Sequence, residues 1–373
     1  MQLTIQRETL LKPLQLLSGV VEKKQTLPIL SNVYIKVLNH QLLVIGADME
    51  IEITASIPID RIKDMISFTV SASKLMDICR AFPDKTKLEI TCREKKIFIK
   101  SGLSNFTLAT LPVEDFPLMD SNKFINKLSI SKQKLLHLLK STSFAMAQQD
   151  VRYYLNGMLW EVDPESFHVI STDGHRMAIA STTMEGVGSD GKEYIQEKII
   201  IPRKAVFELL RLLNDSDETL TIEMGHQSIR VSDTNNSFIS KLIDGRFPDY
   251  KKVIPKDGNK KIKFDREALK SALTRISILS NEQLRAVCFQ FRKEQLCLYT
   301  NNVEQETAEE KMEIEYEGEA FEIVFNVNYL LDILNVCQTD EILFLLRDSN
   351  SSILIEEAGA DEKAFFVVMP MCL

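Results

Sequence analysis

The sequence predicts an α+β fold built from three repeats of one plan. In each third a short alternating strand leads into an amphipathic helix, with strands at residues 3–5, 128–130 and 262–264 and helices at 7–20, 132–146 and 266–279. A second unit of the same kind follows inside each third, with strands at 68–70, 199–201 and 323–325 and helices at 74–82, 203–213 and 326–337. Alternating runs between the helices predict further strands. Such repetition indicates one symmetric object rather than three unrelated modules.

The length and the breaks in the pattern predict where the repeats end. A chain of 373 residues is long enough for two or three domains. Similar segments at 111–117 and 242–248 close the first and second thirds, and polar linkers follow them. We therefore expect three domains, at residues 1–122, 127–250 and 251–373.

Composition excludes several classes of protein. The chain has 45 basic and 53 acidic residues, a net charge of −8, and 45% hydrophobic residues, which is ordinary for a globular protein and unlike a disordered or collagen-like chain. The longest uninterrupted apolar stretch, residues 364–371, is far shorter than the roughly 20 residues that span a bilayer. The N-terminus lacks an apolar signal-peptide core. We expect a cytoplasmic protein with no membrane segment.

The cysteines and histidines predict neither a metal site nor a cofactor site. No two of the six cysteines have CxxC spacing, and the five histidines are scattered singly. Zinc sites need ligands at short, defined spacings. We expect reduced thiols that mostly serve as small core residues.

Two short motifs admit a nucleotide-binding or a catalytic interpretation that the residues around them do not favour. Residues 186–191 match GxGxxG, but a strand rather than a helix is predicted to follow, so a hairpin loop is expected instead of a nucleotide site. Residues 173–176, Asp-Gly-His-Arg, would need a nucleophile beside His175 to form an active site. A recognition turn between two strands explains the same spacing.

Two further segments leave alternatives open. In residues 148–154 an arginine and two tyrosines suit contacts with a sugar-phosphate backbone or with bases, whereas strand alternation would turn one tyrosine inward. The apolar C-terminus, residues 367–373, suits either a core strand or the lining of a peptide groove.

The distribution of charge weakens the objection that an acidic protein should not bind DNA. Five of the six helical segments carry a net positive charge, although the whole chain carries −8. If these helices share one face, that face is basic and suits nucleic acid.

With these features in view, the chain resembles the bacterial replicative sliding clamp, the beta subunit of DNA polymerase III, along its whole length. The matching stretches are residues 10–14, 26–30, 149–158, 172–176, 244–250, 278–282 and 367–371. The resemblance implies a non-catalytic processivity factor without a cofactor, in which two three-domain protomers close head to tail into a six-domain ring around duplex DNA. It also implies that the replicative polymerase alpha subunit, the clamp loader, other polymerases and repair proteins bind through short hydrophobic motifs.

The resemblance also implies which residues contact DNA. The family's positions fall on Lys24, Gln149, Tyr153 and Tyr154, with Arg80, Arg152, Arg203 and Lys204 as basic support. Ser73 departs from relatives that carry a basic residue there.

A partner-binding cleft is implied between the second and third domains. Its expected residues are Leu155, Thr172, Gly174, His175, Arg176, Met177, Pro248, Val253, Val367, Met369, Pro370 and Met371, with Asn326, Tyr329 and Ser352 at the rim. Lys252 and Cys372 stand where the family commonly has arginine.

For the joint between protomers, the resemblance implies that Phe106 and Leu108 of one copy meet Ile278 and Leu279 of the other. Acidic residues would face Lys74 and Lys96 across the joint, namely Glu304, Glu306, Glu309 and Glu310. Leu103 and Asn105 replace basic residues of relatives. Because exposed ion pairs contribute only about 0–1 kcal/mol each, apolar and strand contacts should dominate.

Two other classes of function compete with the clamp. One is a peptide-binding scaffold without DNA, which the net charge favours, and the other is an enzyme that uses His175.

Overall fold

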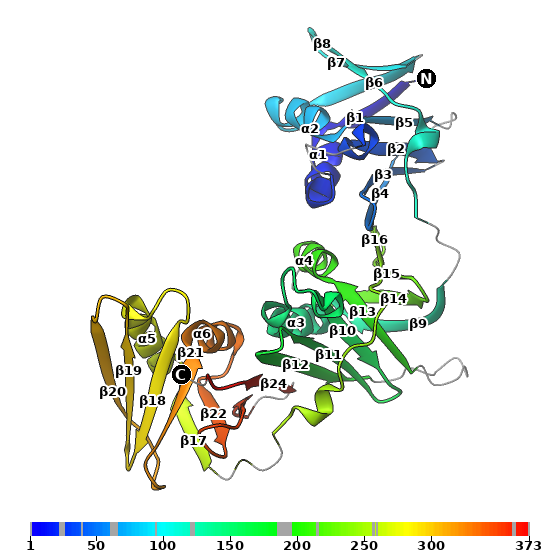
Figure 1. The fold of residues 1–373 in the computed structure, drawn as a ribbon. Coiled ribbons are helices and arrows are strands. Elements are labelled where there is room, and N and C mark those ends of the chain that lie inside the picture. The colour runs from blue at the N-terminus through cyan, green and yellow to red at the C-terminus, as the bar shows by residue number, and fades with distance from the viewer. Residues whose placement is uncertain are drawn as a thin grey trace. The chain divides into compact units, whose positions relative to one another are not determined.

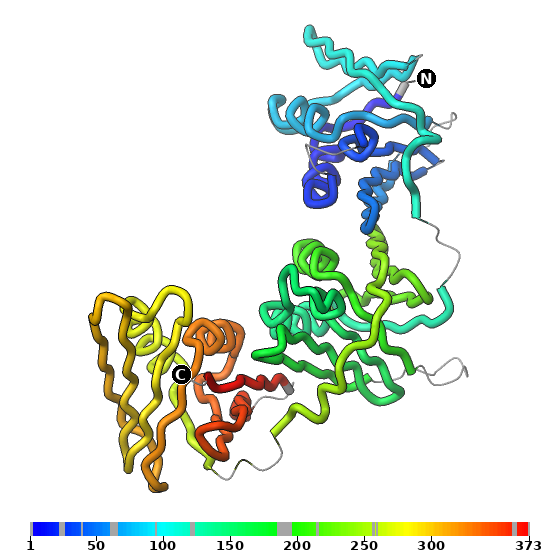
Figure 2. Tube along the Cα trace, in the orientation of Figure 1, coloured from blue at the N-terminus to red at the C-terminus, as the bar shows by residue number. Residues whose placement is uncertain are grey.

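The structure is a computed structural model that describes residues 2–21, 27–38, 40–59, 66–93, 95–119, 124–184, 196–213, 216–255, 258, 260–359 and 363–371. Two compact units make up the chain: residues 1–133 with 207–242, and residues 134–206 with 243–373. Figures 1 and 2 follow the chain through both. Within the described residues, each unit contains one four-stranded and one eight-stranded antiparallel sheet.

All six predicted strand–helix units are present. The strands are β1 (Gln2–Gln6), β5 (Ile66–Ser71), β9 (Phe124–Ser131), β13 (Glu197–Pro202), β17 (Lys260–Asp265) and β21 (Phe321–Asn326). The helices that follow them are α1 (Arg7–Leu16), α2 (Ala72–Ala81), α3 (Lys132–Thr142), α4 (Arg203–Leu212), α5 (Arg266–Ile276) and α6 (Val327–Val336). The sixfold repeat predicted from the sequence is confirmed.

In the last third of the chain, side-chain caps and buried apolar stripes help to explain where the helices form. Asp265 accepts a hydrogen bond from the Ala268 amide at 2.7 Å, and Asn326 accepts one from the Asn328 amide at 3.0 Å, so both helices of the last third have an N-cap. In α5 the buried Leu269 and Leu273 recur at helical spacing. Three predicted helices were too long, because their last turns tighten into 3-10 helices at Leu17–Gly19, Ser143–Ala145 and Ser277–Leu279.

The first unit has a four-stranded sheet and an eight-stranded sheet, and the eight-stranded sheet is made of two groups of strands that join edge to edge. The four-stranded sheet has the order β1-β6-β7-β8, with β6 at Lys87–Arg93, β7 at Lys96–Ser101 and β8 at Ser104–Ala109. The eight-stranded sheet has the order β5-β2-β3-β4-β16-β15-β14-β9, with β2 at Asn32–Leu38, β3 at Gln41–Ala47, β4 at Ile51–Pro58, β14 at Thr219–Gly225, β15 at Ser228–Ser232 and β16 at Asn236–Lys241. Its two halves meet where β4 pairs with β16.

The second unit repeats this arrangement. Its eight-stranded sheet has the order β13-β10-β11-β12-β24-β23-β22-β17, with β10 at Gly157–Val162, β11 at Ser166–Thr172, β12 at Arg176–Thr183, β22 at Glu341–Leu346, β23 at Ile353–Glu357 and β24 at Lys363–Val368. Its four-stranded sheet has the order β20-β19-β18-β21, with β18 at Ala286–Arg292, β19 at Gln295–Asn301 and β20 at Thr307–Glu313. Here the halves of the larger sheet meet where β12 pairs with β24, which brings the C-terminal segment onto the middle of the chain.

Candidate functional site

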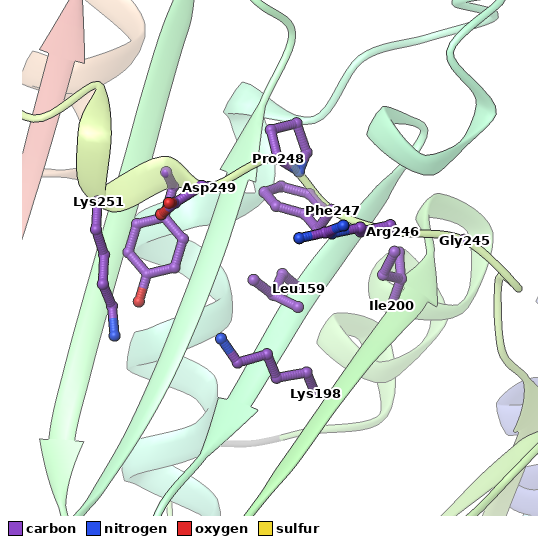
Figure 3. Close-up of a pocket in the computed structure, with 10 residues that line it drawn as sticks. Leu159, Lys198, Ile200, Gly245, Arg246, Phe247, Pro248, Asp249 and Lys251 are labelled. Carbon is purple, nitrogen blue, oxygen red and sulfur yellow. The ribbon is translucent and has the colours of Figure 1, made fainter.

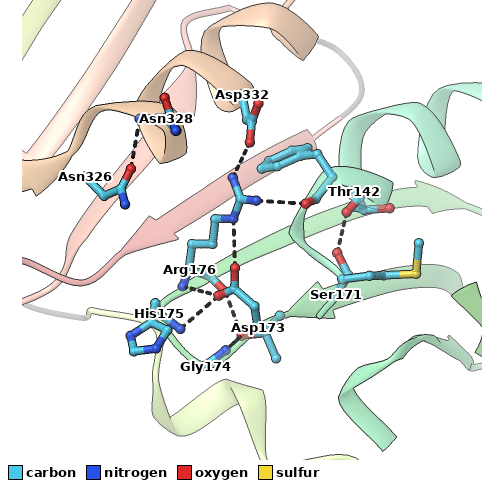
Figure 4. A network of polar contacts seen from close by, with 12 residues as sticks. Thr142, Ser171, Asp173, Gly174, His175, Arg176, Asn326, Asn328 and Asp332 are labelled. Atoms are coloured by element: carbon cyan, nitrogen blue, oxygen red, sulfur yellow. Dashed lines mark hydrogen bonds and ion pairs between the residues drawn. The ribbon is translucent and has the colours of Figure 1, made fainter. Parts of the chain in front are cut away.

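The turn between β11 and β12 is held by its own side chains. Asp173 Oδ1 accepts hydrogen bonds from the backbone amides of His175 at 2.9 Å and Arg176 at 3.0 Å. Thr172 Oγ1 accepts from the Gly174 amide at 3.0 Å, and Gly174 has a φ of 92°, which favours glycine. Figure 4 shows these contacts. The predicted Asp-Gly turn is confirmed, and it leaves His175 exposed to solvent.

Arg176 links this turn to two other elements. Its guanidinium donates to Asp173 Oδ2 at 3.0 Å, to Asp332 Oδ2 on α6 at 2.6 Å and to the Phe144 carbonyl at 3.0 Å (Figure 4). It also lies over the Tyr329 ring, 4.5 Å from the centroid. Arg176 therefore links the turn at residues 172–176, called the cleft turn below, to α6. Its partner Asp332 was not predicted, because nothing in the sequence marks one carboxylate on a helix as the partner of a distant arginine.

Beneath the turn lies an apolar floor formed by the β12–β24 junction. Met177 pairs with Val367 across the two strands, and both are buried in one cluster with Leu159, Ile170, Ile179, Ile200, Tyr250 and Leu354. Leu155 is also buried. Above this floor Met369 and Val253 remain 42% and 43% exposed. The predicted cleft residues thus divide into a buried floor and an accessible apolar rim.

The rest of the predicted cleft residues lie around this floor. Met369 donates its amide to the His175 carbonyl at 2.9 Å, and Met371 donates to the Val324 carbonyl at 2.8 Å, so the C-terminal segment runs from the cleft turn to β21. Pro370 and Ser352 are half-buried, Pro248 is exposed, and Tyr329 is half-buried under Arg176. Asn326 caps α6 and contacts the Leu284 carbonyl.

The candidate DNA-contacting loop contains an internal ion pair. Arg152 donates to both carboxylate oxygens of Asp150, at 3.0 and 2.8 Å, and to the Asp173 carbonyl at 3.2 Å. The side-chain hydrogen bond from Arg152 lowers the pKa of Asp150 to about 2. The positive charge of Arg152 is therefore largely compensated within the chain.

Tyr153 and Tyr154 differ in exposure. Tyr153 is 56% exposed, whereas Tyr154 packs against the buried cluster of the cleft floor. Tyr153–Leu155 forms a 3-10 helix and not a strand, and one of the two tyrosines does turn inward, as the structural alternative required. Gln149 is exposed and has a φ of 56°.

The other predicted DNA-contacting residues lie on helices or outside the described residues. Arg80 is exposed in the last turn of α2. Arg203 and Lys204 begin α4, and Arg203 donates to the Met146 carbonyl at 2.8 Å, which gives it a structural bond. Lys24 lies outside the described residues, as do residues 186–191 and Cys372.

The residues predicted at the joint lie at or near two sheet edges. Phe106 and Leu108 are on edge strand β8. The Phe106 ring packs edge-on against the Phe82 ring, with 5.9 Å between the ring centroids. Ile278 is 76% exposed beside the half-buried Leu279, while Lys74, Lys96, Glu304 and Glu306 are exposed. Glu309 and Glu310 of edge strand β20 already pair within the chain, with Lys311 and Arg275. These two carboxylates are therefore less available to a second copy than predicted.

A cavity of about 480 Å³, which the sequence did not predict, shares Pro248 with the predicted cleft. Its lining comes from β10, from β13 and from the segment after β16, and includes Leu159, Lys198, Ile200, Gly245, Arg246, Phe247, Pro248, Asp249, Tyr250 and Lys251 (Figure 3). Below it, the buried Glu161 accepts hydrogen bonds from Tyr250 at 2.6 Å, Lys198 and Lys251. Burial alone would raise the pKa of Glu161, but the hydrogen bonds from Tyr250 and Lys198 outweigh it and lower the pKa.

The described residues offer no group of three or more histidine, cysteine or acidic side chains that could hold a metal ion. Cys79, Cys297 and Cys337 are buried, as expected of core residues, and burial raises the pKa of Cys337 to about 12. Over the described part of the chain, no helix is long and apolar enough to cross a membrane.

Comparison with known proteins agrees with this architecture. The chain matches three family models of the DNA polymerase III beta subunit: the N-terminal domain over residues 1–120, the central domain over 129–249 and the C-terminal domain over 251–372. A beta sliding clamp of Pseudomonas putida is 46% identical over 373 residues, and one of Escherichia coli K12 is 40% identical, each match covering 100% of both chains.

Solved structures give the same result. A crystal structure of the DNA polymerase III subunit beta from Pseudomonas aeruginosa has a TM-score of 0.95 at 45% identity, covering 100% of each chain. A second clamp structure from that organism, bound to griselimycin, has a TM-score of 0.94 at 46% identity over the same coverage. The three-domain α+β fold predicted from the sequence is confirmed. The chain belongs to the DNA polymerase III beta-subunit family, the bacterial sliding clamps.

Proposed function

We propose that two copies of the chain pair head to tail through β8 and β20 to close a ring around duplex DNA. As a member of this family, the chain is a DNA sliding clamp, a non-catalytic processivity factor that tethers polymerase to DNA. The domain limits 1–122, 127–250 and 251–373 belong to the same proposal, and the limits of the family matches, 1–120, 129–249 and 251–372, lie close to them.

The observation that carries the ring is the difference between the sheet edges. In both eight-stranded sheets the outermost strands, β5, β9, β13 and β17, each lead directly into a helix. Strands β8 and β20 are instead hairpin strands at the edge of a four-stranded sheet. Open edges invite pairing with another strand. In the repeat, β16 and β24 correspond to β8, and β4 and β12 correspond to β20. These counterparts are already paired within the chain, β4 with β16 and β12 with β24.

The pairings of β4 with β16 and of β12 with β24 predict the register in which β20 of one copy should pair with β8 of the other. The Lys241 amide donates to the Glu50 carbonyl at 2.9 Å, and the Met369 amide donates to the His175 carbonyl at 2.9 Å. The first paired residues after the three turns are Glu52, Met177 and Thr307. Glu50 and His175 lie two residues before the first two of these, and Gln305 lies two residues before the third. Gln305 is therefore the equivalent of Glu50 and His175.

On the partner strands β8, β16 and β24, the residues Asn105, Ser237 and Phe365 occupy equivalent positions. Four residues later in each strand stand Ala109, Lys241 and Met369, so Ala109 is the equivalent of the other two. The Ala109 amide of one copy should therefore donate to the Gln305 carbonyl of the other. Leu108 then stands opposite Glu306, and Phe106 opposite Ala308.

The contacts with DNA are proposed to be weak and independent of sequence. Arg80, Gln149, Arg152, Tyr153, Tyr154, Arg203, Lys204 and Lys24 are the proposed contacts. Arg152 is already paired with Asp150, so it can position the loop but releases few counterions on binding DNA. Loose phosphate contacts suit a ring that must slide.

The cleft is proposed to bind short hydrophobic motifs of partner proteins. Its rim offers Met369 and Val253, whose side chains are about two-fifths exposed, beside the accessible His175. Methionine suits an adaptable groove for several different motifs. The griselimycin complex of the Pseudomonas aeruginosa clamp supports a ligand site on this kind of protein. The proposed partners are the polymerase alpha subunit, the clamp loader, other polymerases and repair proteins, all in the cytoplasm.

Retention on DNA tests the ring. Chains loaded onto nicked circular DNA should remain bound after dilution into 0.5 M salt and should be lost when the circle is cut at one site. A matched sample in which both ends of the linear DNA are blocked by bulky proteins should retain the chain. Equal retention on circular and open linear DNA would contradict topological binding.

A further inference from the structure

We propose that the cavity beneath residues 245–251 binds an acidic side chain, with an apolar neighbour, from a peptide that also occupies the cleft. The proposal rests on the peptide-binding function above and extends it across Pro248, the residue that the cavity shares with the cleft.

The cavity has the shape and lining of an amphipathic site. Leu159 on β10 and Ile200 on β13 form an apolar base, and Phe247 forms one wall. Figure 3 shows Leu159, Lys198 and Arg246 directed toward the same space. An apolar pocket with a few converging polar groups is the usual form of a ligand site.

The charges around the cavity favour an anion. Lys198 and Lys251 share one oxygen of Glu161, at 2.9 and 3.3 Å, so two ammonium groups face a single carboxylate. Both lysines keep more than half of their side-chain surface exposed. The guanidinium of Arg246 has neither an ion pair nor a hydrogen bond within the described residues, and it is exposed. The one carboxylate in the lining, Asp249, already pairs with Lys252 at 3.1 Å.

These observations select the chemistry of the occupant. Arg246 can hold a carboxylate through two parallel hydrogen bonds, while the base of the cavity accepts an aliphatic or aromatic side chain next to it. A peptide lying in the cleft would reach this position by continuing past Pro248. The cavity would then distinguish partner peptides that carry an acidic residue beside the hydrophobic motif.

Four capped synthetic peptides test this assignment. One is an apolar core peptide of Leu and Phe, two add Glu-Leu at either end, and the fourth adds neutral Gln-Leu at the end that gives tighter binding. On the unaltered full-length chain at low salt, the Glu peptide should bind about two- to fivefold tighter than its Gln counterpart. Arg246→Gln and Lys198→Gln should remove that difference without weakening the core peptide.

Lys263→Gln is the matched control, because Lys263 is as exposed as Lys198 and pairs with Glu341 on β22, away from the cavity lining. It should keep the preference for Glu. Equal binding of the Glu and Gln peptides, or a Glu preference that survives Arg246→Gln, would overturn the assignment.

The same experiment separates this inference from the proposed function. If the core peptide fails to bind, the peptide-binding cleft is contradicted. The cavity is then judged with the capped dipeptide acetyl-Leu-Glu-amide, detected by saturation-transfer NMR. A signal that disappears in Arg246→Gln supports the cavity by itself, and a signal unchanged by that substitution contradicts it.

Discussion

Two turns of the molecule share one backbone design and differ in their side chains. Asp48 Oδ1 accepts from the amides of Glu50 and Ile51 at 2.7 and 2.6 Å, as Asp173 does from His175 and Arg176. Each turn precedes a strand that pairs with a strand from another part of the chain. The same turn, held by an aspartate side chain and followed by a paired strand, therefore occurs twice in the repeat.

What surrounds the two turns differs. After the first turn Ile51 is fully buried opposite Ser240, whereas the equivalent Arg176 stands opposite Val368 and bonds to Asp332 on α6. The second junction also brings the exposed Met369 beside His175. The same backbone turn is therefore followed by different side chains at the two junctions, and the proposed cleft lies at the β12–β24 junction.

A third turn, at Asn302, completes the comparison. Asn302 Oδ1 accepts from the Glu306 amide at 2.9 Å, as the two aspartates do in their turns. The strand that follows, β20, lies at a sheet edge. We expect a second copy of the chain to supply its partner strand.

The largest effect is expected at the open edge. Phe106→Asp with Leu108→Asp places charges on the face of β8 that is expected to meet Ile278 and Leu279 of the second copy, and should weaken dimerisation by at least about 100-fold, as loss of central apolar contacts does. Sedimentation should show a single 42.6 kDa chain where the unaltered protein sediments at twice that mass. Thr107→Asp, on the opposite face of the strand, is the control and should dimerise more tightly than the double variant. A persistent dimer in the double variant would exclude this edge.

The next largest effect is expected for Arg176, because the turn at Asp173 has its ion pairs and the turn at Asp48 has the apolar Ile51 in the same place. Arg176→Gln removes ion pairs to Asp173 and Asp332 and the contact with Tyr329, and should lower the free energy of unfolding by about 2–4 kcal/mol. Asp332→Asn removes one partner, which is partly exposed, and should cost about 1 kcal/mol. Urea denaturation measures both. Equal losses for the two variants would mean that Arg176 acts only through α6.

Glycine substitutions compare the cleft turn with an unconstrained hairpin. Gly174→Ala adds a methyl group at a φ of 92°, 2.9 Å from the Arg152 guanidinium, and should cost about 1–2 kcal/mol. Gly102→Ala, at a φ of 57° with no atom within 4 Å of the added carbon, should cost about 1 kcal/mol. If Gly102→Ala proved the more destabilising in thermal unfolding, contact with Arg152 would not constrain the cleft turn.

The smallest effect concerns acid stability beside the cleft. The folded-state pKa of Glu161 is lowered, so its ionised form adds stability at neutral pH that is lost as the pH falls through that pKa. Glu161→Gln should lower stability at pH 7 by about 1 kcal/mol, and this deficit should shrink as the pH falls through the folded-state pKa of Glu161. Urea denaturation over a series of pH values measures this. A deficit that grows in acid would assign the wrong sign to the Glu161 contacts.

Much of the fold followed from the sequence because it depends on local pattern. Apolar spacing identified all six helices, and the Asp-Gly signal identified the turn at residue 173. The partner of β12 did not follow, since β24 lies almost two hundred residues later and pairs through backbone atoms that carry no sequence signal. Likewise the buried position of Met177 and the link from Arg176 to Asp332 depend on long-range packing. The cavity beside Arg246 depends on how residues 245–251 cross the sheet, which composition does not reveal.

The register of the third junction tests the central claim most directly. With Leu108→Cys and Glu306→Cys in one chain, mild oxidation should give a covalently closed dimer, because these positions stand opposite each other when β8 of one copy pairs with β20 of the other. Each single variant, which retains the native cysteines, should stay uncrosslinked, and Leu108→Cys with Glu310→Cys should crosslink poorly. Closed dimers in the first variant alone are the predicted result. Equal crosslinking in both double variants, or none in either, would contradict a ring closed by the same junction that the chain forms twice within itself.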